Sequence, residues 1–144
     1  MNELLLMCLI AGRRAAIPAA DVQSVIEVDE ITPIPGVPPF IRGLTALRSQ
    51  ALTVIDCRIA LGFDGLQQVE GQRAAVVQVD GHPYALLVDA AYDVGEARSE
   101  PMAVPGGFGA GWQRTARGMV ETDGGPTLVI DVAALITEPA CQAA

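Results

Sequence analysis

The feature that most constrains the fold of this chain is an internal repeat, in which a pattern returns seventy-five positions further along. Arg42-Gly43-Leu44 returns as Arg117-Gly118-Met119, and Val54-Ile55-Asp56 returns as Val129-Ile130-Asp131. The spacing from the glycine to the aspartate is therefore the same in both copies. Equal spacing at two separate places indicates a duplicated structural unit. The structural positions of this repeat are predicted to be Gly43, Asp56, Gly118 and Asp131.

Apolar residues occur in short runs that are rich in Val, Ile and Leu and are broken by Gly, Pro and Asp. Such runs have the length and composition of β-strands. Within each copy, the segment from the glycine to the aspartate is typical of a hairpin, with turns near Arg48-Ser49-Gln50 and at Asp123-Gly124-Gly125. The predicted strand runs are Leu4–Ile10, Val25–Val28, Leu52–Ile55, Ala74–Val79, Tyr84–Val88 and Thr127–Ile130.

Helical signals are few and short. Cys57–Leu61 and Val132–Ile136 are each predicted to form one or two helical turns, and each follows an aspartate suited to capping a helix start. The pattern therefore predicts a mainly β fold, either barrels or a sandwich. The 144 residues fit a single domain. We expect two repeated halves, about residues 1–66 and 67–144, between which strands can be exchanged.

The charge and the cysteines exclude several classes of function. The chain has 17 acidic residues against 9 basic ones, all of them Arg, for a net charge of −8. Such a surface repels phosphate backbones, so no nucleic-acid partner is predicted. Cys8, Cys57 and Cys141 form no CxxC pair and are predicted to be free, buried thiols in a reducing cytosol.

The N-terminal apolar run is too short to cross a membrane. Leu4–Ala11 has eight residues, whereas a membrane helix needs about 20. Glu3 precedes the run and no Lys or Arg does, so the run is not typical of a secretory signal. We expect a cytoplasmic protein with no direct membrane insertion.

The sequence gives little support for a catalytic or cofactor site. Asp56 and Asp131 can serve as a general acid and base only if they converge in one cleft; their symmetric places favour helix capping, and a small acidic-pair hydrolase is the alternative. His82 follows Asp80-Gly81 and is predicted to be an exposed turn residue, with no further His or Cys at zinc-ligand spacing. Gly106–Gly111 lacks the Lys-Ser/Thr ending of a phosphate loop and is predicted to be a flexible loop. No metal and no cofactor is predicted. Core or loop anchoring is expected for Phe40, Phe63, Tyr92 and Trp112.

Several motifs, taken in order, resemble the CheW-like coupling proteins of bacterial chemotaxis. They are Ala16-Ile17-Pro18, Ile31-Thr32-Pro33-Ile34-Pro35, Ile41-Arg42-Gly43-Leu44, Leu47-Arg48, Val54-Ile55-Asp56-Cys57-Arg58, Leu87-Val88-Asp89 and Leu128-Val129-Ile130-Asp131. The resemblance covers about residues 3–137. It implies two small five-stranded SH3-like barrels packed side by side, with short helical turns.

The resemblance also implies a function and partners. The expected function is that of a non-catalytic adaptor, which couples the cytoplasmic tip of chemoreceptors to the regulatory domain of the CheA histidine kinase. We expect it to be a monomer or to self-associate weakly, and to be recruited to receptor arrays at the inner membrane. A coupling protein of a type IV pilus or other chemosensory-like pathway remains an alternative, as does a fragment of a kinase regulatory domain.

The resemblance implies receptor contact at a groove between the halves. The receptor-binding candidates are Val22, Val25, Leu47 and Arg48, with the three apolar residues equally typical of ordinary core. The family usually reads Asn-Leu-Arg-Gly at the first hairpin, where this chain has Ala46-Leu47-Arg48-Ser49. If Ser49 adopted positive φ, it would cost roughly 1 kcal/mol relative to glycine. We therefore expect a turn of changed type.

Overall fold

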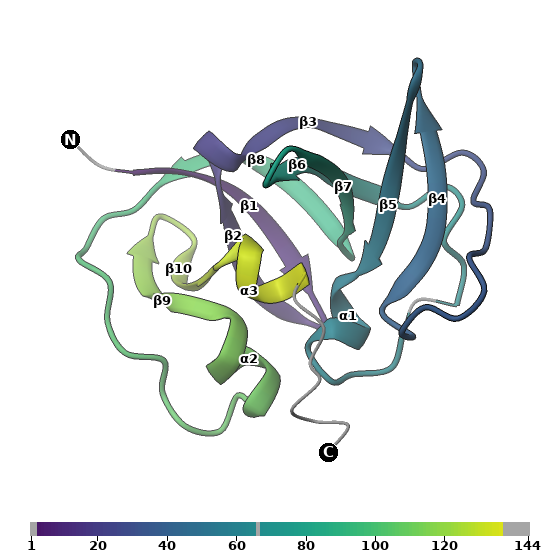
Figure 1. Cartoon of the computed structure of the whole chain (residues 1–144). Helices are drawn as coiled ribbons and strands as arrows, with labels where there is room; N and C mark the ends of the chain where they lie inside the picture. The colour runs from purple at the N-terminus through teal and green to yellow at the C-terminus, as the bar shows by residue number, and fades with distance from the viewer. Residues whose placement is uncertain (1–2, 66, 137–144) are drawn as a thin grey trace.

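The computed structural model describes residues 3–65 and 67–136 and consists of two five-stranded sheets with four short helices (Figure 1). The β1 sheet has the strand order β8-β1-β2-β10-β9, and the β3 sheet has the order β3-β6-β7-β5-β4. The β1 sheet contains β1 (Leu4–Ile10), β2 (Arg13–Pro18), β8 (Ala90–Glu96), β9 (Ala116–Thr122) and β10 (Gly125–Ile130). The β3 sheet contains β3 (Val22–Glu27), β4 (Ile41–Leu47), β5 (Gln50–Asp56), β6 (Arg73–Val79) and β7 (His82–Leu87). The helices are η1 (Ala19–Asp21), α1 (Cys57–Ala60), α2 (Ala110–Thr115) and α3 (Val132–Ile136).

The predicted mainly β fold with two five-stranded units is confirmed. The units resemble SH3 barrels only loosely. Across the described residues, strand pairing joins neither β8 to β9 nor β3 to β4, so each sheet stays open.

The two sheets have the same strand order when β1 to β5 are matched with β6 to β10. The registers match as well. The parallel pair Thr53↔Tyr84 in one sheet corresponds to Leu128↔Ala15 in the other. Residues 42–61 and 117–136 therefore occupy equivalent places, as the repeat predicts.

The offset between the copies changes along the chain, and α2 explains the change. In the first part of the repeat, the pair Leu5↔Pro18 corresponds to Ala74↔Leu87. In the later part, β4, β5 and α1 correspond to β9, β10 and α3 at the longer offset seen in the sequence. The two offsets differ by the 6 residues of α2, which has no counterpart between β3 and β4. An inserted helix between β8 and β9 thus hides the first part of the repeat from a search at a single offset.

Each sheet takes strands from both sides of the predicted division at residues 66 and 67. The β3 sheet is built from one continuous stretch, from Val22 to Leu87. The β1 sheet joins β1 and β2 to β8, β9 and β10, on either side of that stretch. The parallel pairings β2–β10 and β5–β7 are the places where the exchanged strands meet.

The two repeat glycines lie where a connecting segment crosses an edge strand. A Cβ on Gly43, whose φ is 144°, would lie 2.3 Å from the Thr32 carbonyl oxygen. Thr32 exchanges two backbone hydrogen bonds with Leu44 there, at 2.8 and 2.9 Å. At Gly118 the Cβ would lie 3.0 Å from the Met102 carbonyl oxygen, and Met102 makes the same exchange with Met119. Both crossings cover the outer edges of β4 and β9, which limits edge-to-edge association.

The largest apolar core lies between the sheets and the helices, and each sheet also has a smaller apolar cluster of its own. Trp112 is fully buried in the large core and Phe40 nearly so, as predicted. The expectation of a flexible loop over Gly106–Gly111 is wrong at its end, because Ala110 and Gly111 begin α2. Phe63 and Tyr92 are 38% and 58% exposed, so neither is a core anchor.

Candidate functional site

The β4–β5 hairpin projects beyond the other strands (Figure 1). Leu47 pairs with Gln50, which leaves Arg48 and Ser49 as a two-residue turn. Arg48 has a φ of 58°, in the left-handed region, whereas Ser49 does not have a positive φ. The left-handed position is therefore the arginine, not the serine considered from the sequence. A side chain in this conformation costs roughly 1–2 kcal/mol relative to glycine.

The exposed Arg48 lines a hollow of about 530 Å³ that we call the hairpin hollow. It lies between the edge strand β3, the hairpin tip and β6, where the β3 sheet is open. The lining combines apolar side chains with hydrogen-bonding groups and one cation. The lining residues are Gln23, Ser24, Leu47, Arg48, Ser49, Gln50 and Val76.

The four receptor-binding candidates do not all meet at this hollow. Leu47 and Arg48 line it, and both come from the hairpin. Val22 is half-buried and packs against the core between the sheets. Val25 is 37% exposed and lines a different hollow, of about 430 Å³, together with Arg73 and Tyr92.

Two exposed apolar residues on β8 were missed by the sequence reasoning. Tyr92 and Val94 are 58% and 55% exposed on this edge strand. In the alignment that matches β3 with β8, Val94 is the repeat counterpart of Val25, so both edge strands present an exposed valine. The available signal was the alternate placing of Tyr92 and Val94, which puts both side chains on one face of a strand.

Asp56 and Asp131 each stand at the start of a helical turn, as predicted. Asp56 is fully buried, accepts the backbone N–H groups of Arg58 and Ile59 at 3.0 and 3.4 Å, and pairs with Arg42 at 2.8 Å. Asp131 is exposed and accepts the backbone N–H of Ala134 at 3.2 Å. Asp131 lines a hollow that Asp56 does not line, so the pair does not converge there as an acid and a base.

The thiols and the histidine offer no reactive centre in the described part of the chain. Burial, with Asp89 nearby, raises the pKa of the Cys8 thiol to about 12, and burial raises the pKa of Cys57 well above its ordinary value. A thiol held protonated is a poor nucleophile. His82 is exposed at the start of β7, beside the predicted turn. Cys141 lies outside the described residues.

Residues 3–65 and 67–136 offer neither a cluster of metal ligands nor a membrane-spanning helix. That part of the chain holds no group of three or more His, Cys, Asp or Glu side chains arranged for a metal ion. Nor does it contain a helix with the length and apolar character to span a bilayer.

Comparisons with known proteins agree with this geometry. A sequence model of a family described as CheW-like domain matches residues 4–140. The chain is 25% identical over 144 residues to "Chemotaxis protein CheW" of Bacillus subtilis (strain 168), with 99% of this chain and 92% of that protein covered. A crystal structure of the scaffolding protein TtCheW from Thermoanaerobacter tengcongensis superposes with a TM-score of 0.82 at 24% identity. That superposition covers 96% of this chain and 95% of the other.

Proposed function

This chain belongs to the CheW-like domain family, and we propose that it is a non-catalytic scaffold of chemotaxis signalling, which couples chemoreceptors to the CheA histidine kinase. Family membership over nearly the whole chain supports the scaffold role, as do a relative named for chemotaxis and a fold neighbour named as a scaffolding protein. We place the protein in the cytoplasm, where it is recruited to receptor arrays at the inner membrane.

The proposed receptor site is the hairpin hollow. The observation that carries this assignment is Arg48, which is exposed at a projecting tip although its φ of 58° favours glycine. A residue that keeps an unfavourable backbone conformation at a surface turn points to a role for its side chain. Its guanidinium can bind a receptor carboxylate through two parallel hydrogen bonds, while Leu47 offers an apolar contact beside it.

Val22 and Val25 take a smaller part in this proposal. Val22 packs against the core between the sheets, and Val25 lines the neighbouring hollow with Tyr92. We propose that Val25 extends the receptor contact along the β3 edge. We propose that Val22, through its packing against the core, holds β3 in place.

Arg48→Gly separates recognition from folding. Glycine removes the side chain and also relieves the left-handed strain, so the variant is expected to be more stable than the wild type by about 1 kcal/mol. Loss of a central interface arginine costs about 2 kcal/mol or more in binding, so affinity for a receptor cytoplasmic fragment is expected to fall at least about tenfold. Thermal unfolding and calorimetric titration measure the two effects.

Arg13→Ala is the matched control, since Arg13 is an exposed arginine on β2 that lines neither the hairpin hollow nor the neighbouring hollow of Val25. Its affinity for the receptor fragment should stay close to that of the wild type. Receptor affinity that is unchanged in Arg48→Gly would contradict the site. No binding of the wild type to any receptor fragment, with binding to a pilus-type sensory receptor instead, would favour the alternative pathway.

A further inference from the structure

A second hollow, which we call the Asp131 hollow, is lined by residues that the hairpin hollow does not share. It has a volume of about 370 Å³ and is formed by η1, the β6–β7 turn, β9 and the start of α3. Three carboxylates line it, from Asp21, Asp80 and Asp131, and all three residues are exposed. Apolar walls come from Pro18, Val79, Ile130 and Val132.

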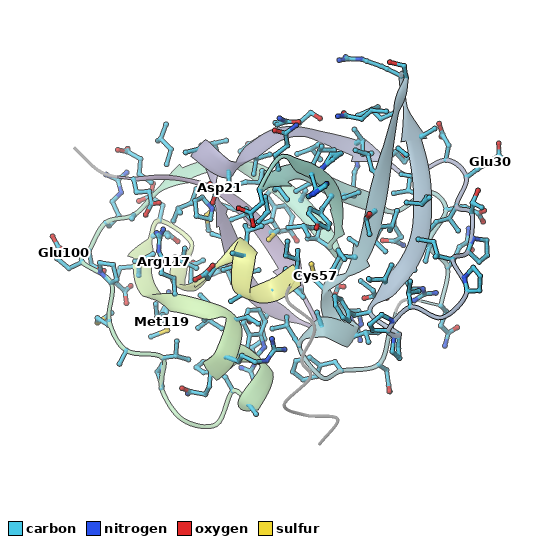
Figure 2. All side chains as sticks on the ribbon, in the orientation of Figure 1. Asp21, Glu30, Cys57, Glu100, Arg117 and Met119 are labelled. Atoms are coloured by element: carbon cyan, nitrogen blue, oxygen red, sulfur yellow. The ribbon has the colours of Figure 1, made fainter. Side chains whose placement is uncertain are left out.

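A cation, Arg117 on β9, lines this hollow as well, but it is already engaged. Arg117 forms an ion pair with Glu3, just before β1. Figure 2 labels Arg117 and Asp21, the two charged residues contributed by β9 and η1. Because the charge of Arg117 is offset by Glu3, the three aspartates leave the hollow negative overall.

The first copy of the repeat shows what occupies the equivalent place. There Arg42, the counterpart of Arg117, pairs with Asp56 at 2.8 Å. Arg58, the counterpart of Ala133, reaches from α1 to Asp89 at the corner before β8, at 2.9 Å. The first copy is thus filled by two guanidinium groups, each on a carboxylate.

In the second copy, neither of these guanidinium groups has an equivalent that fills the place. Arg117 turns toward Glu3, and the position of Arg58 is Ala133, whose side chain is a single methyl group. Carboxylates are nonetheless present: Asp131 matches Asp56, and Asp21 lies at the corner before β3, one position after the counterpart of Asp89. The hollow therefore has the shape and charge of a place for an arginine that the second copy does not itself supply.

We propose that the Asp131 hollow binds an arginine side chain presented by a protein partner. The apolar walls suit the aliphatic stem of an arginine, and the aspartates suit its planar head, which donates in several directions. A single metal ion fits less well, because no three carboxylates in the described parts of the chain converge as metal ligands do. That the ligand is an arginine side chain does not depend on the proposed function. That the partner belongs to a chemotaxis assembly does rest on the proposed function.

The first test probes the hollow with a small ligand, N-acetyl-arginine amide, by ¹⁵N NMR titration of the full chain at low salt. Saturable shifts are expected around Asp21, Asp80 and Asp131, with an affinity at least about threefold above that of N-acetyl-lysine amide. Asp131→Asn should abolish them, and asparagine still caps α3. Asp29→Asn is the matched control, since Asp29 is exposed outside the hollow.

Ala133→Arg gives an independent check, because it restores the arginine that the first copy has at this position. In this variant the new arginine should fill the hollow, so the ligand should no longer cause the NMR shifts. If the variant fails to fold, Asp131→Asn still tests the site. Shifts that persist in Asp131→Asn overturn the site. Equal shifts with the lysine and arginine ligands overturn the guanidinium assignment.

The second test asks for the partner. Asp131→Asn is titrated with a receptor cytoplasmic fragment and with a CheA regulatory domain, and one of the two affinities is expected to fall at least about tenfold. Unchanged affinity for both, with wild-type binding intact, overturns the assignment to a partner of this assembly. Failure of the wild type to bind either protein would count against the proposed function and leave the NMR result standing.

Discussion

Replacing Gly111 with alanine should separate α2 from α1 and destabilise the whole fold. A Cβ on Gly111 would lie 1.9 Å from the Leu61 carbonyl oxygen, whereas ordinary contact begins at 3.4 Å, so the two backbones must move apart. The neighbouring Trp112 is fully buried, and Arg114 donates to the carbonyls of Ala60 and Ala134 at 2.7 and 3.3 Å. The displacement therefore acts on the packing of Trp112 and on the link that α2 makes between α1 and α3.

The magnitude follows from these contacts. A gap of about 0.5–1 Å already removes a quarter to a half of the van der Waals attraction, and full truncation of a buried Trp costs about 3–5 kcal/mol, so the packing loss is about 2 kcal/mol. The stronger hydrogen bond of Arg114 adds roughly 2 kcal/mol. Alanine in a helix gains about 1 kcal/mol over glycine, which leaves a net loss of about 3 kcal/mol. For a chain of 144 residues this lowers Tm by about 10 °C.

Differential scanning calorimetry measures the change, with Gly106→Ala as the matched control. A Cβ on Gly106 meets nothing within 4 Å, and its φ is not in the left-handed region. The control should keep the wild-type Tm. The reasoning would be refuted if the Tm of Gly111→Ala lay within about 1 °C of the control's Tm. The close approach of Gly111 to the Leu61 carbonyl would then carry no energetic cost.

Three further predictions concern buried groups. Asp56→Ala removes a helix cap and the carboxylate that pairs with Arg42 at 2.8 Å, so it should lower the free energy of unfolding by about 3 kcal/mol or more. Asp131→Ala removes only an exposed cap and should lower it by about 1 kcal/mol. Urea unfolding measures both values, and equal losses would contradict this difference. In a Cys141→Ser background, Cys8 and Cys57 should resist thiol reagents at about pH 8 until the protein unfolds. Because folding raises the pKa of both thiols, the unfolded chain loses their protons first. The free energy of unfolding should then decline as the pH rises above about 9, and a rise would contradict the burial of the thiols.

Local structure was largely predictable from the sequence. The runs Leu4–Ile10 and Ala74–Val79 coincide with β1 and with nearly all of β6, because continuous apolar residues mark strands buried on both faces. Asp56 and Asp131 correctly indicated α1 and α3, since capping is a short-range interaction. In contrast, β8 was missed because it is not a continuous apolar run: Asp93 stands between Tyr92 and Val94, and Gly95 and Glu96 follow.

The missing parts depend on contacts between distant residues. Nothing local at Thr53 indicates that its parallel neighbour is Tyr84, since the exchange of strands is decided by the packing of the sheets against each other. The left-handed Arg48 also goes against propensity, which places glycine or asparagine in that conformation. In the candidate sites, the sequence predicted Leu47 and Arg48 together. It did not predict that Val25 would line another hollow, nor that Asp21 and Asp131 would share one.

The exchange of strands also sets the order in which the chain can take shape as it leaves the ribosome. All five strands of the β3 sheet lie between Val22 and Leu87, so this sheet can form before the last third of the protein has been made. The β1–β2 hairpin is synthesised first, yet its parallel partner is β10, which ends at Ile130. At about 5–20 residues per second, the oldest part of the nascent chain waits for several seconds with an uncovered strand. Among the strands, β2 would therefore stay accessible for the longest time to a chaperone that binds newly made chains.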